Sequence, residues 1–264
     1  MMLGGTPNSR LLYDGHLRLA AKQGVRLIAY DRPGYGGSTA QPRRTIADVA
    51  TDVCAVADAL QVDRFGVWGI SGGGPHALAC AALLEGRVVA VASLASPAPF
   101  NAAGLDYFAG MGDMNVEDTK LMLDDADAAR AKNDADRVTL LAATPDGIRE
   151  FMQTLLSPVD AAVLTGAYAE FMARRIQDGL APGAEGAWDD SWAMLQPWGF
   201  ELDAIRVPLQ LWHGRHDRFV PYAHGEWLAT AIPGVDAHLS EDDGHLTLTE
   251  RRLPAIHSWL LEHF

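Results

Sequence analysis

Ser71 is the residue whose surroundings most clearly suggest chemistry. It is the centre of Gly69-Ile70-Ser71-Gly72-Gly73, a G-x-S-x-G pattern that follows the apolar run 65–68 and precedes a helix-like run at 75–84. Glycines two positions before and after the serine allow the strand and helix backbones to approach closely. This strand, turn and helix context predicts a nucleophile elbow. The N–H of Gly72 is then expected to face an oxyanion formed when Ser71 attacks a carbonyl.

A serine hydroxyl needs a base that takes its proton. In this arrangement the partners follow the serine in the order Asp or Glu, then His. Residues 207–212 are typical of a buried parallel strand, and Asp217 lies on the loop beyond it; His245 follows a short last strand at 236–240. Because open α/β sheets place their sites beyond the carboxyl ends of the strands, we predict that Asp217 orients His245. His245 would take the Ser71 proton and return it to the leaving group.

Other titratable residues lie close to these candidates. Asp242 and Asp243 are rivals of Asp217 by composition, but each is too close in sequence to His245 to wrap easily round to its far nitrogen. His76 lies five residues after Ser71 in the same helix. At about 100° per residue it points away from the hydroxyl, so we interpret it as structural.

A metal cluster is the alternative interpretation of the histidines. His213 and His216 could join Asp217 and His245 as ligands, but the H-x-x-H-D spacing lies on a turn rather than on one helix face. Structural metal sites need several ligands directed at one point. The serine mechanism already explains Asp217 and His245, so no metal and no cofactor are predicted.

Taken together, these segments resemble the motifs of the α/β-hydrolase superfamily, of the capped serine-hydrolase type. The matching segments span nearly the whole chain in the family's order: Gly4-Gly5-Thr6-Pro7, residues 31–38, residues 69–73, residues 213–217 and Asp243-Gly244-His245. The resemblance implies that the Thr6 N–H is the second oxyanion donor, beside that of Gly72. Gly4 stands where the family usually has a histidine that braces this loop, which leaves open what braces it here.

The resemblance also draws attention to the start of the chain. The family normally has two antiparallel strands and a full third strand ahead of the Thr6 loop, whereas this chain has three residues there. We therefore expect residues 1–3 to make a poor central strand and the sheet to lack its first strands, with an uncovered edge. Whether the short N-terminus is native or a start-site artefact is open.

Helical and strand patterns alternate in the first hundred residues and again from residue 204. The predicted elements outside the segments named above are a helix at 11–23, a strand at 25–30, a helix at 45–60, a helix at 74–85, a strand at 88–94 and a C-terminal helix at about 254–264. This alternation predicts an α/β fold with a mostly parallel sheet and helices on both faces. Residues 101–203 carry only helical patterns. We therefore predict a core of 1–100 and 204–264, and a helical cap of 101–203.

Composition restricts the partners. The chain of 264 residues has a net charge of −13, which argues against nucleic acid. No apolar run reaches the roughly 18 residues of a membrane helix, and the N-terminus does not resemble a signal peptide. Two cysteines in helix-like runs are consistent with a reducing compartment, so a cytoplasmic location is expected. Few basic residues lie among the aromatic and methionine side chains of the cap, which disfavours a strongly anionic substrate.

The sequence thus predicts a bacterial, esterase-like serine hydrolase. It would cleave an ester-like bond of a small, fairly apolar molecule through an acyl-enzyme. A serine at position 71 disfavours epoxide hydrolases and haloalkane dehalogenases, which need an aspartate there. An aminopeptidase, thioesterase, carbon–carbon-bond hydrolase or perhydrolase remains open, as does a ligand-binding relative without turnover. Substrate identity and oligomeric state are not determined by the sequence.

Overall fold

The computed structural model describes residues 1–264 and contains one five-stranded parallel sheet. Its strands lie side by side in chain order: β1 (Met2–Leu3), β2 (Phe65–Ile70), β3 (Val88–Leu94), β4 (Leu209–Gly214) and β5 (Asp236–Ser240). The strands predicted at 65–70, 88–94 and 236–240 are confirmed, and the one predicted at 207–212 lies two residues later. All carboxyl ends therefore meet at one edge of the sheet.

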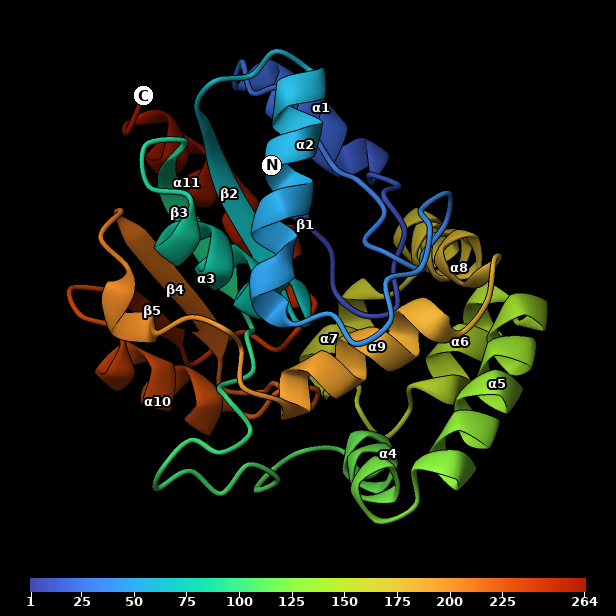
Figure 1. The fold of residues 1–264 in the computed structure, drawn as a ribbon. Helices are drawn as coiled ribbons and strands as arrows, with labels where there is room; N and C mark the ends of the chain where they lie inside the picture. The colour runs from blue at the N-terminus through green and yellow to red at the C-terminus, as the bar shows by residue number, and fades with distance from the viewer.

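Helices cover both faces of this sheet, as predicted. Successive strand residues point to opposite faces, so each strand contributes to two hydrophobic clusters. The first includes Val67, Val91 and Leu211 and packs against α2 (Val49–Ala59), α3 (Gly73–Leu83) and α10 (Tyr222–Ala231). The second includes Trp68, Ala92 and Trp212 and packs against α1 (Asp14–Lys22) and α11 (Thr247–Leu261). In Figure 1, α2 and α3 lie in front of the strands and α11 lies behind them.

Only helices occur between β3 and β4, apart from loops. They are α4 (Asp113–Asp124), α5 (Ala126–Ala142), α6 (Pro145–Phe151), α7 (Pro158–Val163), α8 (Gly166–Leu180) and α9 (Glu185–Leu195). A short 3₁₀ turn at Leu202–Ala204 follows them, and another at Ile46–Asp48 precedes α2. Figure 1 shows α4 to α9 gathered on one side of the sheet. They have a hydrophobic cluster of their own, which also includes Tyr35 and Leu246 of the flanking segments. Residues 101–203 are called the cap segment below.

The strand predicted at 25–30 is wrong. This segment is half-buried and forms no strand, and one backbone hydrogen bond joins it to the sheet, from the Met2 N–H to the Ile28 carbonyl at 2.8 Å. A strand needs a neighbour to pair with along its length. β1 has only two residues, paired on its other side with Trp68 and Gly69, so it cannot pair with the whole of 25–30.

The start of the last helix is also corrected. We expected a helix from about Pro254, but α11 begins at Thr247 and contains Pro254 in its interior. Proline lacks an N–H and usually ends or starts a helix, which made it look like a first-turn residue. The true start is fixed by a side chain from the cap segment, described below.

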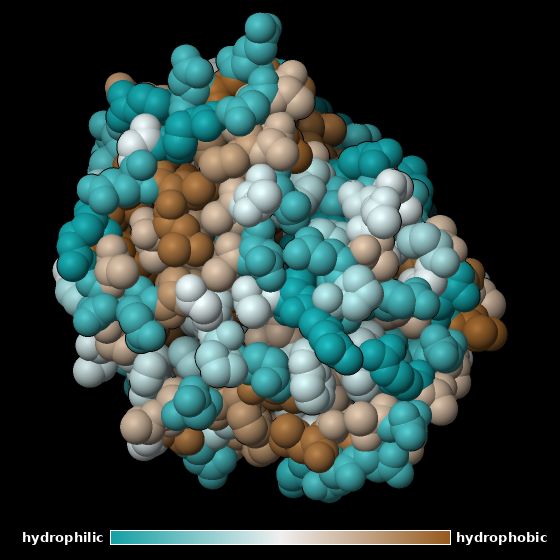
Figure 2. Space-filling view, in the orientation of Figure 1, coloured by the Kyte–Doolittle hydropathy of each residue, from teal (hydrophilic) through white to brown (hydrophobic).

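The outer surface is mixed in character. Hydrophilic residues cover much of the face shown in Figure 2, with hydrophobic residues exposed in small groups among them. None of the helices combines the length and apolar character that crossing a bilayer requires.

Candidate active site

Ser71 lies at the sharp turn between β2 and α3. Its φ of 55° falls in the left-handed region, which non-glycine residues rarely adopt and which is often strained at functional sites. The turn tolerates no side chains around it, because a Cβ on Gly69 would clash with the Gly73 carbonyl and a Cβ on Gly73 with the Leu3 carbonyl. The structure thus contains the strand, tight turn and helix expected around Ser71. Ser71 Oγ itself makes no hydrogen bond in this structure.

Asp217 and His245 are brought together from two loops at the same edge of the sheet. His245 Nδ1 donates to Asp217 Oδ2 at 2.7 Å, and both side chains are almost completely buried. The second oxygen of Asp217 accepts the N–H groups of Phe219 at 2.8 Å and Val220 at 2.9 Å. These bonds fix the carboxylate, which in turn fixes the orientation and the tautomer of the imidazole.

The environment of His245 favours its charged form. Burial alone would lower the pKa of His245, but the carboxylates of Asp217 and Asp160 outweigh burial and raise this pKa above its ordinary value of 6.5. The Phe219 ring stacks on the imidazole with 4.4 Å between ring centroids. Phe219 also lines the cavity that contains Ser71.

The rival residues have other partners. The Asp243 carboxylate accepts hydrogen bonds from Ser240 and from the two arginines at 251 and 252. His213 is buried beside Asp217, but its Nε2 is bonded to the Val220 carbonyl. His76 Nδ1 bonds the Gly72 carbonyl at 2.7 Å, and burial lowers the pKa of His76 to about 4. These contacts support a structural role for each of them.

The expected oxyanion donors lie against the serine. A Cβ on Gly72 would be 2.5 Å from Thr6 Oγ1, and a Cβ on Gly5 would be 3.1 Å from Ser71 Cβ. The amide N–H groups of Thr6 and Gly72 donate no hydrogen bond to another protein group, and both residues line the same cavity as Ser71. Two adjacent unpaired amides of this kind are suited to stabilise an oxyanion.

Charged side chains, rather than a histidine, brace the Thr6 loop. Arg32 donates to the Gly4 carbonyl, to the Gly5 carbonyl at 3.2 Å and to Thr6 Oγ1 at 3.2 Å. The Arg175 guanidinium occupies the space that a side chain at position 4 would need. Position 4 is therefore glycine because an arginine from α8 fills the site. Burial lowers the pKa of Arg175 to about 10.

Asp190 of α9 completes this brace. It is fully buried, and its Oδ2 accepts from Thr6 Oγ1 at 2.7 Å and from Tyr35 Oη at 2.9 Å. Arg32 and Arg44 both pair with the same carboxylate. Burial opposes the charge, but the two arginines outweigh it and hold the pKa of Asp190 well below its usual range. Arg175 and Asp190 could not be predicted from the sequence, because their partners are distant in the chain and no local pattern marks them.

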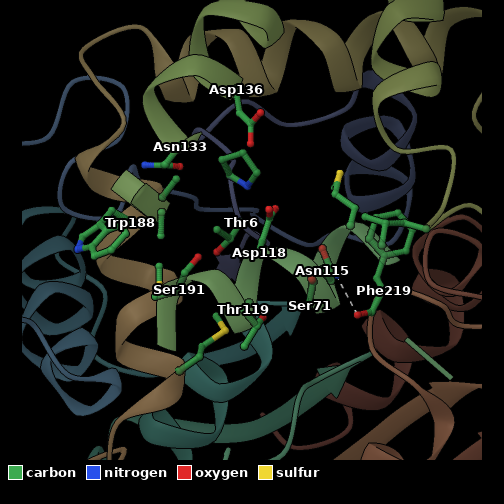
Figure 3. Close-up of a pocket in the computed structure, with 18 of the residues that line it drawn as sticks. Thr6, Ser71, Asn115, Asp118, Thr119, Asn133, Asp136, Trp188, Ser191 and Phe219 are labelled. Atoms are coloured by element: carbon green, nitrogen blue, oxygen red, sulfur yellow. Dashed lines mark hydrogen bonds between the residues drawn. The ribbon is translucent and has the colours of Figure 1, made fainter. Parts of the chain in front are cut away.

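A cavity of about 290 Å³ opens from Ser71 into the cap segment. Figure 3 shows Ser71 and Phe219 on one side of it, Trp188 and Ser191 of α9 on the other, and Asn133 and Asp136 of α5 at its top. Most of the lining is apolar and includes Met111, Met114, Phe151, Met152, Leu155 and Met194.

One basic residue, Lys132, lines this cavity. Its Nζ lies 2.8 Å from Asp118 Oδ1 and 2.6 Å from Asp136 Oδ2, and both carboxylates line the cavity too. The group therefore carries one positive and two negative charges. Because Lys132 is paired with both carboxylates, the cavity does not offer a free cation to an anionic substrate.

Comparison with known proteins settles the family. The family model described as the alpha/beta hydrolase fold matches residues 1–251. The chain belongs to the α/β-hydrolase family. Over 256 residues it is 27% identical to the AB hydrolase superfamily protein YisY of Bacillus subtilis, covering 96% of this chain and 86% of that protein. A shorter stretch of 48 residues is 44% identical to a pimeloyl-[acyl-carrier protein] methyl ester esterase of Aromatoleum aromaticum, and covers 18% of this chain and 19% of that protein.

Solved structures share the fold of this α/β-hydrolase at low sequence identity. A thermophilic esterase from Thermogutta terrifontis superposes with a TM-score of 0.70 at 20% identity, covering 100% of this chain and 89% of that one. The enol-lactonase from Burkholderia xenovorans LB400 superposes with a TM-score of 0.65 at 20% identity, covering 99% of this chain and 90% of that one. At such identities the likeness concerns the fold alone.

Proposed function

We propose that this α/β-hydrolase is a serine hydrolase that cleaves an ester-like bond of a small, fairly apolar molecule. The observation that carries the proposal is the buried 2.7 Å bond between His245 and Asp217, on loops that leave the same sheet edge as the elbow with Ser71. A histidine held in this way is a competent general base for a serine hydroxyl. We also propose that residues 101–203 act as a cap that forms the walls of the substrate cavity.

The proposed reaction proceeds in two halves. Ser71 Oγ attacks the carbonyl carbon and its proton passes to His245 Nε2, while His245 Nδ1–H remains bonded to Asp217. The N–H groups of Thr6 and Gly72 stabilise the oxyanion. Collapse expels the alcohol, which takes the proton from His245 and leaves an acyl group on Ser71. Water then attacks this ester with His245 as base, the acid is released, and Ser71 regains its proton.

The lining of the cavity supports a neutral substrate. The cavity has a volume of about 290 Å³ and a mostly apolar wall, which suit a small acyl or alcohol group. Lys132 is already paired with Asp118 and Asp136, so a substrate carboxylate would meet net negative charge there. The T. terrifontis esterase and the B. xenovorans enol-lactonase share the fold, and esters and lactones both contain the acyl–oxygen bond that this mechanism cleaves.

We expect neutral esters to be cleaved faster than anionic ones of the same length. The p-nitrophenyl ester of pentanoate should exceed the p-nitrophenyl hemiester of glutarate, which has the same five-carbon chain, in kcat/KM by at least about tenfold, which corresponds to about 1.4 kcal/mol. Asp118→Asn, which removes one of the two negative charges, should narrow the difference. Equal rates for both esters would refute the preference for a neutral substrate, and hydrolysis of neither would count against the esterase proposal.

We expect the activity to rise with pH through a pKa above the ordinary histidine value. Only neutral His245 can accept the Ser71 proton. Because its pKa is raised above 6.5, the inactive protonated form persists to higher pH than for a free histidine. The kcat/KM for a neutral ester, measured from pH 5 to 9 at constant ionic strength, should show its acid limb above pH 6.5. A limb below that value would contradict the proposed electrostatics.

A further inference from the structure

Asp160 of α7 is a fully buried carboxylate outside the groups that carry the proposed chemistry. Its Oδ2 accepts from Ser157 Oγ at 2.7 Å and from the His245 N–H at 3.0 Å. Its Oδ1 accepts from the N–H groups of Leu246 at 2.7 Å and Thr247 at 3.3 Å. One side chain of the cap segment therefore binds three consecutive backbone amides, beginning with that of His245.

These amides stand at the start of α11, where a helix has N–H groups without partners in the helix itself. A carboxylate at this end also interacts favourably with the positive end of the helix dipole. The residue before His245 is adapted to the contact, because a Cβ on Gly244 would clash with Asp160. Asp217 holds the ring of His245, and Asp160 holds its backbone.

We propose that Asp160 is a positioning residue for proton transfer by His245. It would fix the imidazole against Ser71 from the cap side, and its negative charge would favour the imidazolium that forms when Ser71 loses its proton. The inference rests on the proposed function. It adds that the cap segment takes part in the chemistry, beyond forming the cavity.

Few charged groups act on the imidazole. Asp217 faces its ring from the loop after β4, and Asp160 faces its backbone from α7; both raise the pKa of His245. The neighbouring ring of His213 on β4 is buried, and burial lowers the pKa of His213, so that it is neutral near pH 7. Phe219 covers one face of the imidazole with an apolar ring. Removal of the Asp160 charge should therefore leave Asp217 as the one carboxylate that supports the imidazolium.

The test compares Asp160→Asn with Asp125→Asn. Asp125 is a matched control, because it also caps a helix of the cap segment, accepting the Ala128 N–H at 3.0 Å, but it is exposed. Asp160→Asn should lower kcat for a neutral ester by about 10- to 100-fold, as expected when a catalytic group is slightly misplaced, with KM changed less than about twofold. The pKa of His245, followed by NMR with labelled histidine, should fall. Asp125→Asn should change neither quantity.

The NMR titration separates this proposal from the proposed function. If the wild type cleaves no ester, a lowered His245 pKa in Asp160→Asn still supports the link between the two residues. An unchanged His245 pKa together with an unchanged kcat would overturn the proposal and leave Asp160 as a helix cap. If Asp160→Asn does not fold, Ser157→Ala removes one hydrogen bond from the carboxylate. A fall in kcat at constant KM in that variant supports the proposal, and an unchanged kcat refutes it.

Discussion

Alanine at position 71 is expected to reduce kcat for ester hydrolysis by on the order of 10⁶-fold, the loss seen when the nucleophile of a serine triad is removed. The reason is that no acyl-enzyme can form without the Ser71 hydroxyl, whereas the Thr6 and Gly72 amides and the cavity remain. His245→Ala should cost about as much, and the double variant little more, since the two residues act as a unit. Steady-state rates with a p-nitrophenyl ester measure all three.

Covalent labelling gives an independent check on Ser71. A fluorophosphonate reacts with activated serines, and intact-mass analysis should show one adduct in the wild type and none in Ser71→Ala. Ser93→Ala is a matched control, because Ser93 is a buried serine on β3 opposite Gly69; its adduct should match that of the wild type. An adduct that persists in Ser71→Ala would show that another residue is the nucleophile.

Asn at position 217 is expected to lower kcat by about 10⁴-fold, as in serine proteases when the orienting aspartate becomes asparagine. Its carbonyl oxygen can still accept the N–H groups of Phe219 and Val220, so the loop should keep its shape. Its NH₂ group would then face His245 Nδ1. That contact favours the tautomer with the proton on Nε2, which cannot accept the Ser71 proton.

The control for this change is Asp242→Asn. Asp242 is exposed, lies close to His245 in sequence, and should be replaceable without loss of rate. Circular dichroism and thermal melting of both variants would show that the folds are intact. A loss of less than about tenfold in Asp217→Asn would mean that a different acid orients His245.

The parts of the structure that the sequence predicted are those that depend on local patterns. The strands before Ser71, Asp217 and His245 are continuous or alternating apolar runs, and their parallel arrangement brings the loops after β4 and β5 together. The contact between His245 and Asp217 could be predicted in this way. The catalytic roles of Ser71, Asp217, His245, Thr6 and Gly72 all remain predictions, supported by the elbow conformation, the His245–Asp217 contact and the unpaired amides.

The features that could not be predicted from the sequence depend on partners far apart in the chain. The start of α11 could not be found, because the carboxylate that satisfies its first amides belongs to Asp160, 85 residues before His245. The brace of the Thr6 loop was also missed, since Asp190 lies 184 residues from Thr6. Neither contact produces a periodic pattern. The strand predicted at 25–30 also depends on a distant partner. Its sequence is an apolar run, but without a full partner strand this run does not form a hydrogen-bonded ladder.

Two of the buried aspartates of the cap segment bear on how a substrate would reach Ser71. Asp160 is bonded to the loop of His245, and Asp190 to the loop of Thr6. Lifting the whole cap segment would break both sets of contacts, and each hydrogen bond to a charged group typically contributes about 1.5–3 kcal/mol. In contrast, Lys132 joins α4 and α5 through half-exposed side chains, and exposed pairs contribute little. We therefore expect substrate access to require movement of α4 relative to α5 more readily than displacement of α7 and α9, which carry Asp160 and Asp190.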